Sequence, residues 1–102
     1  MSKFNELIQE ETPLLVDFYA IWCSPCKVLS PILKEVKTEL GNQLKVIKVD
    51  IDKNPQVASH YDVSGVPTII LFQKGEQLWR QSGLVPKNQL IDTIKSKITK
   101  IK

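Results

Sequence analysis

The chain contains the stretch Trp22-Cys23-Ser24-Pro25-Cys26-Lys27, which holds its only two cysteines. This stretch follows an apolar run at residues 14–20 and precedes a segment with helical periodicity. Two intervening residues let both sulfurs sit on the first turn of that helix, close enough to form a small ring. Closing so small a ring stabilises the folded protein by only about 2 kcal/mol, through the lower entropy of the unfolded chain. The disulfide is therefore more useful as a bond that opens and closes. The pattern predicts a redox-active cysteine pair where a strand meets a helix.

The two cysteines are predicted to have different roles. Cys23 falls at the helix N-terminus, where unpaired amide groups and the helix dipole favour a thiolate. Because the thiolate is the attacking species in disulfide exchange, Cys23 is the predicted nucleophile. Cys26 lies one turn deeper, and we expect it to be shielded and to resolve the mixed disulfide. Pro25 suits the first helical turn, where its missing N–H costs nothing.

Other uses of a cysteine pair are less consistent with the sequence. A structural disulfide remains an alternative, although so short a loop stabilises little. Structural zinc takes four ligands, and the one histidine, His60, has no partner at ligand spacing. A haem attachment site needs histidine where the chain has Lys27. We therefore predict no metal site.

Length and composition narrow the class of protein further. The 102 residues, 42% of them hydrophobic, predict one domain over residues 1–102. The net charge of +3 is small and dispersed, which argues against a nucleic-acid partner. The N-terminus lacks a basic segment followed by an apolar one, and no stretch is long enough to span a membrane. We expect a cytoplasmic protein without a membrane partner, where a dithiol is more often catalytic than structural.

The pattern of apolar residues and breakers predicts an α/β fold. Strands are expected at 14–20, 44–50, 68–72 and 76–82, and helices at 2–9, 25–40, 54–61 and 86–98. The early strands alternate with helices, which favours parallel pairing, while Lys74-Gly75 suits a hairpin between the last two strands. The result is a central mixed sheet of about four strands, flanked by helices on both faces.

Several further segments occur in the order and spacing of one known family. They are Val16-Asp17-Phe18-Tyr19-Ala20, the cysteine stretch 22–27, Pro31, Lys48-Val49-Asp50, Tyr61-Asp62-Val63, Gly65-Val66-Pro67-Thr68, Phe72 with Lys74-Gly75, and Gly83. On these segments the chain resembles the thioredoxin family from about residue 4 to its end. The resemblance implies the thioredoxin fold.

The resemblance also implies the surroundings of the cysteines. It brings Val66-Pro67 beside them, with Pro67 in the cis form that is essentially confined to proline. The backbone of Val66 would pair with a substrate peptide by strand addition. An apolar rim for docking protein disulfides would surround Cys23, formed by Trp22, Val66, Gly83 and Leu84.

Asp17 is a charged residue inside a strand that the pattern predicts to be buried. Burial of an unpaired carboxylate raises its pKa. The resemblance places Asp17 behind Cys26, with Lys48 near it on the adjacent strand. There it would take the proton of Cys26 as that thiol attacks, through water. The alternative is a structural carboxylate whose hydrogen bonds are satisfied.

The chain departs from the family in two places. Ser24 replaces the usual glycine, and its hydroxyl could bond a sulfur or cap the helix, which would shift the reduction potential. Residues 2–9 already match the family's first helix, so we expect its N-terminal edge strand to be missing. Strand 44–50 then becomes an edge through which a monomer could weakly self-associate, although Lys45 opposes this and Lys48 is expected to point inward.

These features predict a thiol-disulfide oxidoreductase that reduces protein disulfides. We expect no bound cofactor, because the Cys23–Cys26 couple is itself the redox group. The resemblance implies that a thioredoxin reductase, a flavoprotein using NADPH, supplies the electrons. Two alternatives stay open: a thiol oxidase or isomerase of an oxidising compartment, and a non-catalytic binding module. The reduction potential tests the first, and a Cys23→Ser substitution tests the second.

Overall fold

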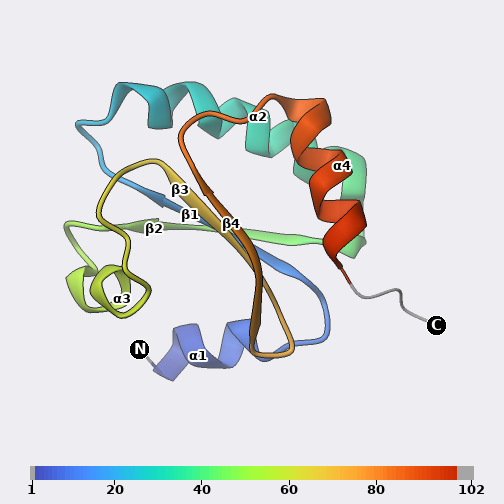
Figure 1. Ribbon diagram of the computed structural model, residues 1–102, viewed down its shortest axis with the longest axis horizontal. Coiled ribbons are helices and arrows are strands. Elements are labelled where there is room, and N and C mark those ends of the chain that lie inside the picture. Colours follow the sequence, from blue (N-terminus) through green and yellow to red (C-terminus); the bar gives the residue numbers. More distant parts are fainter. Residues whose placement is uncertain (1, 99–102) are drawn as a thin grey trace.

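The computed structural model describes residues 2–98, which form one sheet between two pairs of helices (Figure 1). The elements in chain order are α1 (Ser2–Ile8), β1 (Leu14–Tyr19), α2 (Ser24–Leu40), the 3₁₀ turn η1 (Gly41–Gln43), β2 (Lys45–Asp50), α3 (Pro55–His60), β3 (Thr68–Gln73), β4 (Glu76–Ser82) and α4 (Lys87–Lys97). The helices α2 and α4 cover one face of the sheet, and α1 and α3 cover the other.

The sheet has four strands in the order β2-β1-β3-β4. Strand β1 pairs in parallel with β2 and antiparallel with β3, while β3 and β4 form an antiparallel hairpin. Its turn places Lys74 and Gly75 at φ of 55° and 83°, the left-handed values that a tight hairpin turn needs. The predicted mixed sheet with helices on both faces is therefore confirmed, and β2 is one of its edges within residues 2–98.

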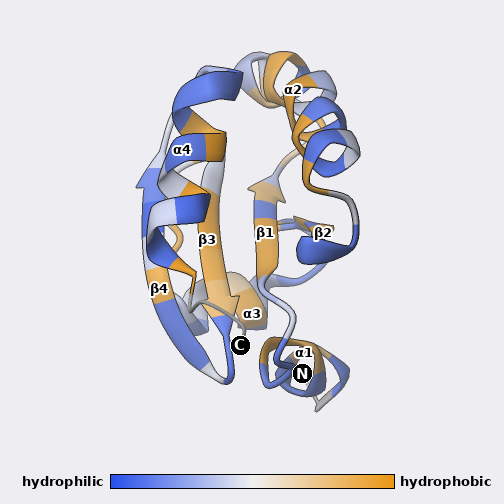
Figure 2. Cartoon of the chain, turned by 90° about the vertical axis from the view of Figure 1, so that its right-hand side faces the viewer, coloured by the Kyte–Doolittle hydropathy of each residue, from blue (hydrophilic) through white to orange (hydrophobic). Residues whose placement is uncertain are grey.

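A separate hydrophobic core fills each side of the sheet. On the α2 and α4 side, Leu15 of β1 packs with buried leucines and isoleucines of both helices. On the opposite side, Phe18 of β1 packs with Phe4 of α1 and Val57 of α3. Figure 2 shows β1 and β3 as largely hydrophobic along their length, as expected of central strands covered on both faces.

Helix α2 is defined at both ends by its caps. The sulfur of Cys23 occupies the N-cap position and accepts a hydrogen bond from the backbone N–H of Cys26, at 3.1 Å. At the other end Gly41 has φ of 56°, and its N–H donates to the carbonyl of Lys37. Between the caps, Leu29, Leu33, Val36 and Leu40 are buried at helical spacing. This packing fixes the first turn of α2 beyond the end of β1, where the two cysteines lie.

Candidate active site

The two cysteines form a disulfide on the first turn of α2. Their Cα atoms are 5.3 Å apart, and each residue is only 4% exposed. The backbone N–H of Cys23 donates to the carbonyl of Ala20 at 3.1 Å, which ties the cysteine to the segment that leaves β1. The shielding that we expected for Cys26 is present, but Cys23 shares it in this disulfide form.

The N-cap of α2 is Cys23 rather than Ser24. The hydrogen bond from the Cys26 N–H and the positive end of the helix dipole both act on the Cys23 sulfur. Ser24 is the first helical residue, is exposed, and makes no hydrogen bond through its hydroxyl in the described residues. The capping or sulfur-bonding role that the sequence allowed for Ser24 is therefore not seen, because the cysteine sulfur already occupies the cap.

A loop remote in sequence closes one side of the cysteine pair. The Val66-Pro67 peptide bond is cis, as the resemblance implied. Val66 packs against the small cluster of Ala20, Cys23 and Cys26. The carbonyl of Pro67 accepts a hydrogen bond from the N–H of Gly83 at 2.8 Å, so the start of β3 and the end of β4 are held together beside the disulfide. Gly83 has φ of 91°, a conformation that favours glycine.

Two of the four residues expected to form the rim are exposed, while Val66 and Gly83 are half-buried. Trp22 is 66% exposed and Leu84 is 46% exposed. The indole N–H of Trp22 donates to Oδ2 of Asp52 at 2.9 Å, which orients the ring. Asp52 was missed from the sequence, because nothing local marks a loop residue thirty positions away as a partner of Trp22. Ile21 was also missed; it is 69% exposed, and its signal is an apolar residue between the buried strand and Trp22.

Asp17 is a fully buried carboxylate. Its side chain lies on the α2 side of β1, and neither carboxylate oxygen has a hydrogen bond among the described residues. The pKa of Asp17 is raised from 3.8 to about 6, mainly by burial, and the charge of Lys48 partly opposes this rise. The alternative of a satisfied structural carboxylate is not supported by these contacts.

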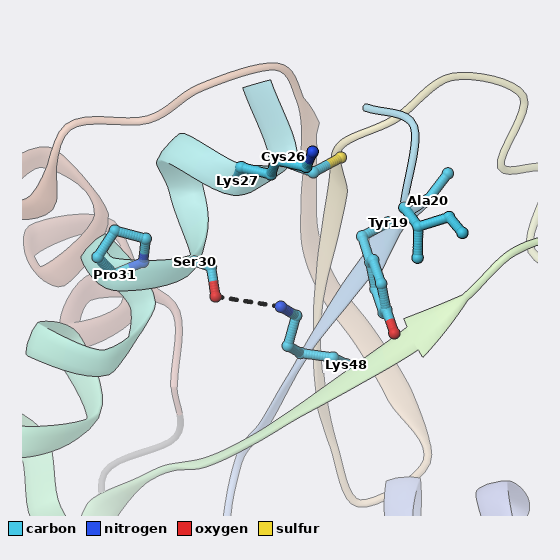
Figure 3. A pocket seen from close by; sticks show the side chains of 8 residues that line it. Tyr19, Ala20, Cys26, Lys27, Ser30, Pro31 and Lys48 are labelled. Atoms are coloured by element: carbon cyan, nitrogen blue, oxygen red, sulfur yellow. Dashed lines mark hydrogen bonds between the residues drawn. The ribbon is translucent and has the colours of Figure 1, made fainter. Parts of the chain in front are cut away.

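Lys48 lies beside Asp17 but does not point inward as we expected. The two residues are register partners on the parallel strands β1 and β2. The Lys48 side chain is exposed, and its Nζ donates to Oγ of Ser30 at 3.1 Å (Figure 3). Because β2 is a sheet edge, this long charged side chain can reach toward α2 while its ammonium group stays accessible to water.

The described residues do not add an obvious second type of site. Within residues 2–98, no three side chains of the His, Cys, Asp or Glu types gather as metal ligands would. In the same range, no helix is long and apolar enough to cross a bilayer. The redox group that the structure does show is the Cys23–Cys26 pair.

A disulfide at a helix N-terminus, faced by a cis-proline loop on a mixed sheet, defines a thiol-disulfide oxidoreductase. The chain belongs to the thioredoxin family, whose family model, described as Thioredoxin, matches residues 1–96. The class and the named relatives below support the activity of a protein-disulfide reductase.

Curated and solved relatives agree with this assignment. The chain is 46% identical to a thioredoxin of Rickettsia felis over 98 residues, which covers 95% of this chain and 93% of that protein. It is 45% identical to the chloroplastic thioredoxin Y of rice, with 93% of this chain and 57% of that protein covered. A mutant thioredoxin from Halobacterium salinarum has a TM-score of 0.86 and 34% identity, covering 100% of this chain and 88% of that one. Oxidised mitochondrial thioredoxin 3 of Saccharomyces cerevisiae has a TM-score of 0.84 and 32% identity, covering 93% of this chain and 88% of that one.

Replacing Asp17 by asparagine is expected to stabilise the protein in a pH-dependent way. Between the ordinary pKa of 3.8 and about 6, the folded state keeps a proton that the unfolded state releases. Stability of the wild type therefore falls as pH rises through this window, and it stays lower above it. The pKa difference corresponds to at most about 3 kcal/mol. Burying the amide of asparagine without a partner offsets part of that, so we expect a gain of about 1–2 kcal/mol at pH 7.

Urea unfolding of both proteins at pH 7 and at pH 3.5 measures this gain. The gain is expected to be lost at the lower pH, where the folded wild type holds the proton and most of the unfolded chain does too. The exposed Asp92→Asn provides a matched control and is expected to change stability by less than about 0.5 kcal/mol. A gain that is equal at both pH values would contradict the burial of a charged carboxylate as its cause.

Proposed function

We propose that the protein reduces disulfides of other proteins with Cys23 as the nucleophile and Cys26 as the resolving thiol. The observation that carries this assignment is the position of the Cys23 sulfur at the N-cap of α2, where it accepts the N–H of Cys26. This amide and the helix dipole stabilise negative charge on Cys23 rather than on Cys26. The two sulfurs are therefore unequal before any substrate arrives.

The reaction follows from this inequality. The Cys23 thiolate attacks one sulfur of the substrate disulfide, forms a mixed disulfide with it, and releases the other sulfur as a thiolate. The Cys26 thiolate then attacks the Cys23 sulfur, which releases the second substrate thiolate and leaves the Cys23–Cys26 disulfide. Two electrons pass to the substrate, and the protein ends in the oxidised state that the structure shows.

Asp17 is proposed to take the proton that Cys26 must lose before it attacks. A carboxylate with a pKa of about 6 is a stronger base near neutral pH than an ordinary aspartate. Its oxygens have no hydrogen-bonding partner among residues 2–98, so they remain available to a proton carrier such as water. The position on the α2 side of the sheet supports this role.

Substrate docking is proposed to use the apolar rim around Cys23. The exposed side chains of Trp22 and Leu84 and the glycine Gly83 offer a surface for protein substrates. The backbone of Val66, next to the disulfide, is proposed to pair with an extended substrate segment. Pro25 keeps the first turn of α2 fixed beneath this surface.

The remaining biological context is proposed from the family. Thioredoxins in general act with disulfide substrates and a reductase, and we propose an NADPH-dependent flavoprotein reductase as the electron donor and no additional bound cofactor. Similarity to bacterial thioredoxins supports a cytoplasmic protein, although chloroplastic relatives also occur. We propose a monomer whose β2 edge permits weak self-association at high concentration.

The assignment of the two thiols is tested by trapping the mixed disulfide. Pre-reduced Cys26→Ser is expected to accumulate a covalent complex with insulin through Cys23, because no second thiol resolves it. Cys23→Ser is expected to form little complex, and both variants should lose catalytic insulin reduction. Mass spectrometry of the complexes identifies the linked cysteine. Trapping through Cys26 instead would reverse the assignment, and activity in Cys23→Ser would favour a non-catalytic binding module.

Ser24 is expected to have little influence on the reduction potential. Its hydroxyl makes no hydrogen bond to either sulfur, so Ser24→Gly should shift the potential by less than about 15 mV, equivalent to about 0.7 kcal/mol. Equilibration of both proteins with glutathione measures the two potentials. A larger shift would show that Ser24 tunes the couple in solution, and a strongly oxidising wild type would favour an oxidase or isomerase over a reductase.

A further inference from the structure

Ser30 of α2 lines a pocket of about 400 Å³ that opens beside Cys26. Its wall also contains Tyr19 and Ala20 at the end of β1 and Lys48 of β2, as Figure 3 shows. Ser30 is half-buried and lies four residues after Cys26, one helical turn further along α2. The hydroxyl of Ser30 is therefore presented to the pocket from the same helix that holds the resolving thiol.

Two contacts hold the ammonium group of Lys48 at this pocket. Its Nζ donates a hydrogen bond to Oγ of Ser30 at 3.1 Å. The same atom lies 4.6 Å from the centroid of the Tyr19 ring, a cation–π distance. No carboxylate forms an ion pair with Lys48 among residues 2–98, so these contacts, from α2 and β1, are what restrains an otherwise flexible side chain.

The location of this ammonium group matters because of Asp17. Lys48 and Asp17 are register partners, so their side chains leave β2 and β1 on the same face of the sheet. Lys48 is also the one charge that opposes the effect of burial on Asp17. A positive charge acts strongly on a buried carboxylate when it is held nearby and weakly when it moves into water.

The other charged and titratable groups around Asp17 do not substitute for Lys48. Strand β3 places the apolar Ile69 opposite Asp17. On β2, Oδ1 of Asp50 accepts the N–H groups of Asp52 and Lys53 and so is directed toward its own loop. Besides Lys48, the titratable groups that line the pocket are Cys26 and Lys27 of α2 and Tyr19 of β1.

We propose that Ser30 is a positioning residue that, with the ring of Tyr19, holds the Lys48 ammonium over the pocket and thereby sets how readily Asp17 carries a proton. This inference rests on the proposed function, in which Asp17 accepts the proton of Cys26. Without the Ser30 hydroxyl, the ammonium group loses its hydrogen-bonding partner in the protein and moves toward bulk water, where its attraction for Asp17 is screened.

The test is an NMR titration of the Asp17 side-chain carboxyl in the oxidised full-length protein. The disulfide form is chosen because Cys26 does not titrate in it. Ser30→Ala is expected to raise the pKa of Asp17, making it about threefold weaker as an acid, while Ser30→Thr keeps the wild-type value. Lys48→Met, which retains most of the stem without the charge, is expected to raise the pKa further. Adding Ser30→Ala to Lys48→Met should then change nothing more.

A matched control separates this effect from a general loss of a helix hydroxyl. Ser96 of α4 also uses its Oγ in a hydrogen bond, to the carbonyl of Thr93, and Ser96→Ala is expected to leave Asp17 unchanged. The inference is overturned if Ser30→Ala leaves the pKa of Asp17 unchanged or lowers it. It is also overturned if Ser30→Ala raises this pKa equally in the Lys48→Met background, because the effect would then not pass through Lys48.

A second readout links the positioning to turnover. In Ser30→Ala, the acidic limb of the pH profile for insulin reduction is expected to move to higher pH by as much as the pKa of Asp17 rises in the titration. Ser30→Thr is expected to restore the wild-type profile. Failure of the proposed function gives a different result: an unchanged reduction rate in Asp17→Asn would reject the proton-acceptor role of Asp17. The titration would still decide whether Ser30 positions Lys48, since it does not depend on catalysis.

Discussion

The junction between β1 and α2 is the constraint on which the site depends. The chain leaves a buried strand at Tyr19 and enters a helix within five residues, and the Cys23 sulfur caps that helix by accepting the N–H of Cys26. The cap stabilises negative charge on the Cys23 sulfur rather than on the Cys26 sulfur. The loop from Val66 and the turn at Gly83 then pack around a pair whose geometry the junction has already fixed.

The same junction explains why an unfavourable residue is tolerated in the core. Asp17 lies two residues before Tyr19, on the face that α2 covers, and its buried carboxylate has no hydrogen-bonding partner within residues 2–98. A buried charge of this kind lowers stability, and an apolar residue at this position would not. Local rules of folding are most often broken at functional sites, so the position of Asp17 next to the cysteine-bearing helix supports a role in proton handling.

Much of this architecture could be predicted because it follows from local patterns. The apolar runs at residues 14–20, interrupted by Asp17, and at 68–72, which is continuous, predicted two of the strands, and the element order predicted the mixed sheet. The face used by Trp79 could not be predicted, because the β3–β4 register shifts between Leu71 and Phe72. The shift lets both Leu78 and Trp79 contact the same core, which breaks the simple alternation along β4.

Site residues were harder to predict where their positions depend on distant partners. The spacing of the cysteines identified the pair, but the direction of Lys48 depends on β2 being an edge and on Ser30 offering an acceptor. Neither condition is visible in the residues that surround Lys48 in the sequence. The orientation of Trp22 likewise depends on Asp52, which follows a different strand. Both interactions are between side chains from different elements, and only the folded chain brings them together.

The segment from Tyr19 to Trp22 separates two surfaces of the site. Trp22 is exposed on the side of the proposed substrate rim, whereas Tyr19 and Ala20 line the pocket that contains Cys26 and Lys48. The proposed nucleophile, Cys23, packs against Val66 and does not line this pocket. A protein substrate bound over Cys23 would therefore leave the pocket beside Cys26 open to water. In the proposed mechanism, docking and proton transfer would therefore use different residues around one disulfide, so the rim could be substituted without altering Lys48 or Ser30.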